Sequence, residues 1–311
     1  TVVTAFTLAS FINFFGIRSS AWFSNFCAVT GLLIPMTAII VLGALWMLSG
    51  KPMQIHFTLK EMMPDLSHPG MLVSLTGIIM SLCGIEIATV HAQDVEHPQK
   101  TYPRVLMYSV LIILSTMILG SLAIAIVIPN GQINLVSGIM QAFEPFLSAY
   151  HLQVLLPIVA LMIVIGGMGG VSNWIIAPTK GLMVAAHDGC LPKFLQKTNR
   201  FGAPVYLLLL QASLVWLMST LFIFMPSVSG SYWLLTALAA QLYMVMYALM
   251  FMAIIKLRKD GVLEHASFKI PGGKIGFWVV LIAGFIGVTL TLGVSFFTPD
   301  NINVGKSSMY H

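Results

Sequence analysis

The stretch Met71–Ala92, which reads MLVSLTGIIMSLCGIEIATVHA, decides the fold class because it sets one carboxyl group inside an apolar run of membrane-spanning length. A helix needs about 20 apolar residues to cross roughly 30 Å of bilayer hydrocarbon. Glu86 is the one acidic residue inside such a run, since the others lie in loops or at helix ends. A charge at mid-membrane costs about 2.5–3.5 kcal/mol on insertion scales. The pattern therefore favours a functional glutamate, and the alternative is a structural one that is protonated or bonded to a neighbouring helix.

Gly84 lies two residues before Glu86, near the middle of the segment that ends at Pro98. Glycine weakens a helix, and a helix interrupted at mid-depth exposes N–H and C=O groups. Such groups hold the charged ends of substrates in transporters, provided that the gap lines a protein cavity. The alternative is a close-packing glycine, which is the commoner use of glycine in membrane helices.

The composition supports a membrane protein. Of 311 residues, 58% are apolar and 8% are charged, and the mean hydropathy is +0.93. So few charges exclude a disordered chain, a nucleic-acid-binding arm and an ordinary soluble enzyme. We count eight apolar runs and expect an all-α polytopic bundle of about eight transmembrane helices: Thr1–Phe15, Ala21–Leu48, Met71–Ala92, Val105–Ile128, Leu152–Ala186, Val205–Phe224, Trp233–Ile255 and Ile275–Phe297.

Two of these runs differ from a simple span. The first is already apolar at Thr1, so we expect a fragment whose first helix is truncated. The fifth is too long for one straight span, and we expect either a bend at Pro178 or a tail that leaves the membrane. The loop after the fourth run contains Leu135–Phe146, which fits either a short amphipathic helix over the outer face or an ordered loop.

The distribution of Lys and Arg predicts the orientation. With the turn at Arg18 on the cytoplasmic side, the outer side holds Lys51, Lys60 and Lys306. The other twelve basic residues are then cytoplasmic, as the positive-inside rule requires: Arg18, Lys100, Arg104, Lys180, Lys193, Lys197, Arg200, Lys256, Arg258, Lys259, Lys269 and Lys274.

Further candidate residues lie in the later runs. Tyr243 and Tyr247 are four residues apart on one helix face, where they either line a polar cavity or pack as aromatic rings. Trp174 lies deep in the fifth run, where packing is again the alternative. The cluster Gly166–Gly170 is interpreted mainly as a close helix contact.

Several chemistries are not supported by any motif. The sequence has no phosphate-binding Gly-Lys-Ser/Thr loop, no His-Glu-x-x-His and no pair of aspartates within the runs. Three scattered cysteines, Cys27, Cys83 and Cys190, do not suggest a disulfide framework or a zinc site. We therefore expect no enzyme, no cofactor, no metal and no nucleic-acid partner.

The third run and its exit resemble the sixth helix of the amino acid–polyamine–organocation superfamily. That helix often shows an acid, then Asn-Pro, a basic residue and Pro. Here Asp94 stands for the usual Glu, His97 for Asn and Lys100 for Arg. The matching segments are Gly84–Glu86, Asp94, His97-Pro98, Lys100 and Tyr102-Pro103, with Phe268–Lys274 similar to the family's loop between helices ten and eleven. Ala125–Leu135 and Pro299–Ile302 look like bacterial glutamate/γ-aminobutyrate antiporters.

The resemblance implies helices four to eleven of a twelve-helix transporter whose core is a five-plus-five inverted repeat. It implies the following organisation: 1–48, the last two helices of the first repeat; 49–70, an outer loop; 71–256, the second five-helix repeat; 257–274, a cytoplasmic loop; and 275–311, an additional helix and outer tail. It also implies a substrate site at mid-membrane, formed in this chain by Ser81, Cys83, Gly84, Ile85, Glu86, Trp174, Tyr243 and Tyr247. Some of these antiporters carry a carboxylate four residues before the tryptophan, where this chain has Gly170.

The function implied is secondary active exchange of small amino acids across a bacterial inner membrane, with glutamate entering and γ-aminobutyrate leaving. Coupling to a cytoplasmic glutamate decarboxylase, and hence acid resistance, follows from the resemblance alone. The alternatives are an exchanger or permease for other amino acids and, with less support, a passive channel, which usually has a ring of polar pore-lining groups. A membrane enzyme using Glu86 lacks a second well-placed catalytic group.

Overall fold

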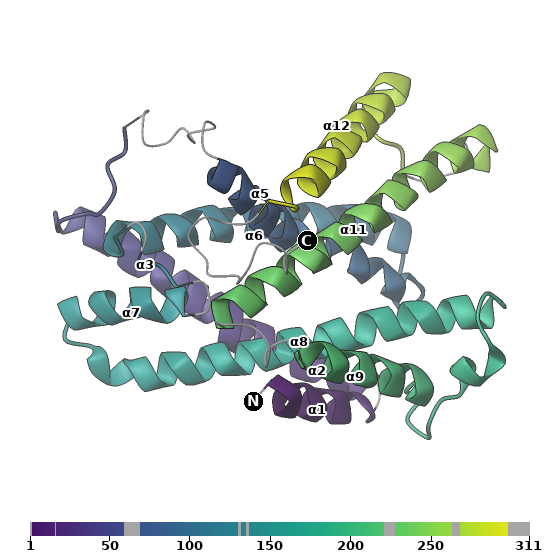
Figure 1. Ribbon diagram of the computed structural model, residues 1–311, viewed down its shortest axis with the longest axis horizontal. Coiled ribbons are helices and arrows are strands. Elements are labelled where there is room, and N and C mark those ends of the chain that lie inside the picture. The colour runs from purple at the N-terminus through teal and green to yellow at the C-terminus, as the bar shows by residue number, and fades with distance from the viewer. Residues whose placement is uncertain are drawn as a thin grey trace. The chain divides into compact units, whose positions relative to one another are not determined.

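The computed structural model describes residues 2–15, 17–58, 69–129, 132–134, 137–220, 228–262 and 268–297. Within these ranges the regular secondary structure is helical, apart from one isolated antiparallel bridge between Thr198 and Pro204 (Figure 1). The chain folds into two compact units. The predicted motif Pro299–Ile302 lies outside the described residues.

The first unit contains residues 1–56, 87–90 and 112–224. Helix α8 runs through this unit and contacts most of its other elements (teal in Figure 1). The elements are α1 (Val2–Asn13), α2 (Ile17–Ala28), a π-helical turn (Val29–Leu33), α3 (Ile34–Leu48), the second part of α6 (Pro98–Val127), α7 (Gly138–Ala149), a 3₁₀ turn (Gln153–Leu155), α8 (Leu156–His187), a 3₁₀ turn (Lys193–Gln196) and α9 (Val205–Ser219).

The second unit contains residues 57–86, 91–111 and 225–311. Its helices α5, α11 and α12 all contact one another, so each apolar helix finds two neighbours within the unit. The elements are α5 (Pro69–Leu82), most of a 3₁₀ helix (Ile85–Asp94), the start of α6, α11 (Val228–Lys259) and α12 (Gly273–Val294).

The helices confirm the all-α polytopic prediction. Five helical segments in the described residues are long and apolar enough to cross a bilayer: Trp22–Leu48, Pro98–Val127, Gln153–His187, Val228–Lys259 and Gly273–Val294. The other three predicted runs correspond to shorter apolar helices, Val3–Asn13, Leu75–Val90 and Val205–Ser219. Each of the eight predicted runs thus contains a helix, and two of the helices, Trp22–Leu48 and Gln153–His187, agree with their predicted runs within one residue at each end.

The π-helical turn follows from a proline. Pro35 has no N–H and cannot bond the carbonyl of Gly31 four residues earlier. The helix widens just before it, and the N–H of Ile34 donates to the carbonyl of Val29, five residues back. Gly31 within this turn meets Gly166 of α8, and a Cβ added at Gly166 would lie 2.5 Å from the Gly31 carbonyl. The packing interpretation of the Gly166–Gly170 cluster is therefore confirmed at Gly166.

The long helix α8 continues through Pro178 instead of ending there. Proline leaves the carbonyl four residues earlier, that of Trp174, without its helical donor. The side chain of Gln211 on α9 donates to this oxygen from Nε2 at 3.0 Å. The 32 residues of α8 rise about 48 Å, which exceeds the roughly 30 Å hydrocarbon thickness. This excess length favours the predicted alternative in which an end of the fifth run lies beyond the hydrocarbon.

The predicted amphipathic helix exists as α7, three residues further along the chain at each end. Its apolar face is buried, with Phe143 and Phe146 about fully covered by α3, α6 and α8 residues such as Ile39 and Ala123. This helix therefore packs its apolar face against protein. Trp46 stacks edge-on against Phe146, with ring centroids 5.5 Å apart.

Replacing Gln211 tests how Pro178 is accommodated. Gln211→Leu leaves the Trp174 carbonyl without its side-chain donor, at a cost of about 1–3 kcal/mol, so the apparent unfolding temperature in detergent should fall. In a Pro178→Ala background the backbone supplies an N–H to that carbonyl, and Gln211→Leu should cost less. Tryptophan fluorescence during a thermal ramp measures both values, and an equal loss in the two backgrounds would contradict the assignment.

The glycine contact gives a matched pair on one helix. Gly166→Ala places a Cβ 2.5 Å from the backbone of Gly31 and should lower the unfolding temperature by several degrees. Gly167→Ala meets nothing within 4 Å and should leave it unchanged or raise it slightly. Similar losses for the two variants would show that α8 tolerates separation from the π-helical turn.

Candidate substrate site at a helix break

The predicted interruption of the third run is present. Helix α5 ends at Leu82, and the N–H of Cys83 donates to the carbonyl of Met80 at 3.1 Å. Gly84 follows in the left-handed conformation, with φ 103° and ψ −4°, and a 3₁₀ helix begins at Ile85. A residue without a Cβ adopts this conformation at little cost, so the glycine explains where the helix breaks. Of the two alternatives predicted for Gly84, the structure therefore shows the helix break and not a close-packing glycine inside a continuous helix.

Glu86 folds back over the break. Its Oε2 accepts a hydrogen bond from the N–H of Gly84 at 3.1 Å and one from the hydroxyl of Tyr247 at 2.8 Å. Both bonds are strengthened when the carboxyl group is ionised. The carboxylate thus covers an N–H that the break has removed from the helical ladder, in a half-buried position. The structural alternative predicted for Glu86, a bond to a neighbouring helix, is therefore observed, and it places the acid directly at the interruption.

Tyr243 and Tyr247 lie on α11, one turn apart. Their rings meet edge to face with centroids 5.8 Å apart, and both side chains are half-buried. The sequence left two alternatives for these tyrosines, aromatic packing and a polar role. The structure shows features of both, because the two rings pack on each other and the Tyr247 hydroxyl donates to the carboxyl group of Glu86. Aromatic packing fixes the direction of the ring, and the hydroxyl at its end becomes a positioned donor.

The remaining residues near the break make local bonds. The hydroxyl of Ser81 donates to the Ile78 carbonyl at 2.6 Å, and the thiol of Cys83 donates to the Ile79 carbonyl at 3.2 Å. Ile85 is the first residue of the 3₁₀ helix. The structure therefore brings Gly84, Glu86 and the two tyrosines together.

Trp174 belongs to the first unit, whereas the break belongs to the second. Its indole is 43% exposed within the described structure. A position on the same substrate path as Glu86 remains a prediction. Among the described residues there is no group of three or more His, Cys, Asp or Glu side chains with metal-binding proximity.

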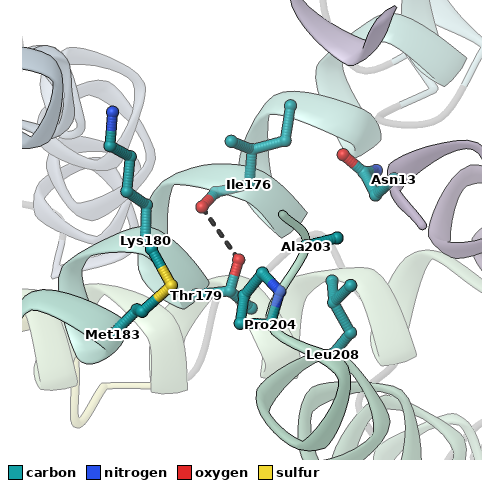
Figure 2. Close-up of a pocket in the computed structure, with 8 residues that line it drawn as sticks. All are labelled: Asn13, Ile176, Thr179, Lys180, Met183, Ala203, Pro204 and Leu208. Atoms are coloured by element: carbon teal, nitrogen blue, oxygen red, sulfur yellow. Dashed lines mark hydrogen bonds between the residues drawn. The ribbon is translucent and has the colours of Figure 1, made fainter. Parts of the chain in front are cut away.

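Sequence reasoning missed a second polar position, Asn13 at the end of α1. Its side-chain nitrogen donates to the Ala9 carbonyl at 2.8 Å and to Ser172 at 3.2 Å, and Asn13 is 4% exposed. Asn13 lines a small pocket within the first unit (Figure 2), together with Ile176, Thr179, Lys180, Met183, Ala203, Pro204 and Leu208. An amide inside the first apolar run was the signal that could have found it.

The conformation of His97 gives a physical reason for one departure from the family pattern. His97 has a positive φ of 49°, and the N–H groups of Lys100 and Thr101 both donate to its carbonyl. Asparagine adopts left-handed backbone more readily than most residues, and histidine shares part of this tendency. The histidine therefore fits a turn at which the family often has Asn.

Apolar helices of spanning length, with one interrupted helix whose carboxyl group accepts a hydrogen bond from a tyrosine of another helix, define a multi-pass membrane protein of the transporter class. Residues 2–311 match the amino acid permease family, and the chain belongs to that family. The match confirms the predicted superfamily and the predicted membrane location.

Three bacterial proteins illustrate the relationship. An uncharacterized transporter of Legionella pneumophila is 39% identical over 98% of this chain and 65% of its own length. The glutamate/γ-aminobutyrate antiporters of two Lactococcus lactis strains, IL1403 and MG1363, are each 30% identical over 91% of this chain and 57% of their own length. The chain thus spans between 57% and 65% of the length of these relatives.

Substitutions of two glycines test the break: Gly84, which follows the end of α5, and Gly77, which lies within α5. Gly84→Ala forces a Cβ into left-handed backbone and should cost about 1–2 kcal/mol, which lowers the unfolding temperature in detergent. Gly77→Ala on the same helix places its Cβ at an ordinary 3.8 Å from the Trp233 ring and should be neutral or stabilising. A neutral Gly84→Ala would mean that the helix can continue through this position.

Proposed function

We propose that the protein is a secondary active antiporter of small amino acids, and that glutamate entering against γ-aminobutyrate leaving is its first candidate pair. The observation that carries this proposal is the carboxylate of Glu86, held at a helix break by Gly84 and Tyr247. The membership of the amino acid permease family and the 30% identity to antiporters of that name support the pair. Ser81, Cys83, Ile85, Trp174 and Tyr243 complete the proposed substrate site.

The break has the chemistry to hold a zwitterion. The N–H of Gly84 already binds one carboxylate oxygen, that of Glu86, so a substrate carboxylate is a suitable replacement ligand. A substrate that takes this N–H frees Glu86, which then accepts the substrate ammonium group. Tyr247 continues to donate to Glu86 during the exchange and thereby keeps the carboxylate close to the break.

The competition between Glu86 and the substrate carboxylate for the N–H of Gly84 determines which group covers the break. In the empty site Glu86 covers the exposed backbone, and in the occupied site the substrate does so. The backbone is satisfied in both states, which permits the site to face either side without leaving a bare polar group in the membrane. Rocking of one helix bundle against the other supplies alternating access in this mechanism. Coupled to a cytoplasmic glutamate decarboxylase, such a cycle would remove protons from the cell and contribute to acid resistance.

A related exchanger or permease for other amino acids is the second candidate function. Gly170, which occupies a position where some glutamate/γ-aminobutyrate antiporters carry a carboxylate, favours it. A Cβ at Gly170 would meet nothing within 4 Å, so the missing side chain leaves open space in this unit. A change in that space alters gating or substrate choice without altering the break.

Tyr247→Phe tests the site in the full-length protein. The change removes one hydrogen bond to a carboxylate, worth about 1.5–3 kcal/mol, and should reduce the initial rate of exchange by about 10- to 100-fold. Glu86→Ala should abolish exchange. Tyr232→Phe is the matched control, because Tyr232 lies on the same helix with 48% of its surface exposed, and it should exchange at the parent rate.

Proteoliposomes loaded with unlabelled γ-aminobutyrate, or left empty, measure the effect through uptake of labelled glutamate. An antiporter takes up label into loaded vesicles only, whereas a channel fills both. Vesicles loaded with a different amino acid in place of γ-aminobutyrate test the second candidate function, exchange of other amino acids. Parent-like counterflow by Glu86→Ala, or uptake independent of internal substrate, would refute the proposal.

A further inference from the structure

The connection between α8 and α9 carries a surface that the transport mechanism does not use. We define the basic–aromatic loop as residues 193–206, with cations Lys193, Lys197 and Arg200 and aromatic residues Phe194, Phe201 and Tyr206. We propose that this loop binds the headgroup of an anionic phospholipid in the cytoplasmic leaflet.

The loop stands at a membrane boundary because apolar helices precede and follow it. Helix α8 ends at His187, and α9 begins at Val205 directly after Pro204. In Figure 1 the chain leaves the end of α8 and turns back into α9 within this short connection. The predicted orientation places the loop on the cytoplasmic side, where anionic lipids create the negative surface potential.

The three cations are available for a phosphate. Lys193, Lys197 and Arg200 are exposed, and none of them has a carboxylate within 4.0 Å in the part of the chain that the structure describes. Asp188 is the one acidic residue between α8 and α9, and it forms no ion pair with them by the same measure. A guanidinium and two ammonium groups without acidic partners are opposite in charge to a phosphodiester and supply N–H donors for its oxygens.

The aromatic rings match the remainder of a lipid. Phe194, Phe201 and Tyr206 are between 42% and 53% exposed, although they are large. Phe194 and Tyr206 pack edge-on at 5.8 Å, with the Lys197 ammonium 6.0 Å from the Tyr206 ring. The Arg200 guanidinium lies 4.7 Å from the Phe201 ring. Each ring group thus combines an apolar body with a cation, as in residues that anchor proteins in the headgroup region.

The backbone of the loop is fixed before any lipid binds. Asn199 accepts hydrogen bonds from the N–H groups of Phe201 and Ala203 at 2.9 and 3.0 Å. Its side-chain nitrogen donates to the Phe14 carbonyl at the end of α1, at 2.7 Å. Arg200 and Phe201 therefore project from an ordered turn, which lowers the entropy lost when a headgroup is bound.

Titration of the purified protein with phosphatidylglycerol, followed by native mass spectrometry, tests the proposal. Lys197→Gln with Arg200→Gln should weaken phosphatidylglycerol binding by about fivefold for each cation removed, or about 30-fold in total. The matched control is Lys256→Gln with Lys259→Gln, which removes two basic residues at the end of α11 and should keep the parent affinity. The readout is lipid retention, so it is independent of whether the protein exchanges glutamate.

Three results would overturn the proposal: equal retention of phosphatidylglycerol by the loop variant and the parent, an equal loss in the control variant, or equal binding of phosphatidylcholine by the parent. Inorganic phosphate at millimolar concentration should not compete with the lipid, because it offers nothing to the rings. Full competition by phosphate would assign the cations to a soluble anion instead. All four residues changed are exposed or at a helix end, and unchanged unfolding temperatures check that the variants fold.

Discussion

Backbone polar groups in an apolar environment must find partners within the protein, and this constraint explains the local structure at Pro35, Pro178 and Gly84. At Pro35 the helix widens so that Ile34 donates to Val29. At Pro178 a side chain from another helix, Gln211, donates to the carbonyl of Trp174. At Gly84 the following carboxylate accepts from the exposed N–H. An unsatisfied group in hydrocarbon costs several kcal/mol, so these three solutions are conditions for the fold to exist.

The three solutions differ in what they permit. The π-helical turn is closed by the backbone itself, and the amide of Gln211 is neutral and binds its carbonyl in one arrangement. The carboxyl group of Glu86 ends a flexible side chain, and its Oε2 accepts from two donors, the N–H of Gly84 and the hydroxyl of Tyr247. A break that is covered by a movable carboxyl group is suited to a ligand that carries the same group, whereas the other two breaks are suited to shaping helices. The proposed site follows from this difference, and so does its dependence on Tyr247 to hold the carboxyl group nearby.

Apolar run length was sufficient to predict the helices. Gly84 left a helix break and close packing as alternatives, and the family resemblance placed the break at Ser81–Ile85. The pairing of Glu86 with Tyr247 was not predictable, because 161 residues separate them and only tertiary packing brings them together. Gln211 was missed for a related reason, since its role depends on a proline in another helix. Asn13 was missed although its signal was present, because an uncharged amide within an apolar run marks a site less strongly than a carboxyl group does. The direction of α7's apolar face needed the structure, as an amphipathic pattern does not distinguish lipid from protein.

The approach of Gly31 to Gly166 has a consequence for how the family's sequences can vary. In most helix contacts a larger side chain on one helix is accommodated by a smaller one on the facing helix. A substitution at one position can therefore be compensated by a substitution at the other. Here the atoms in conflict are main-chain atoms on both sides, and neither position has a side chain left to reduce. A side chain added at either position therefore cannot be relieved by a substitution at the other, because a backbone atom stands in its way. Pairwise correlation between aligned sequences would fail to detect one of the tightest contacts in the unit.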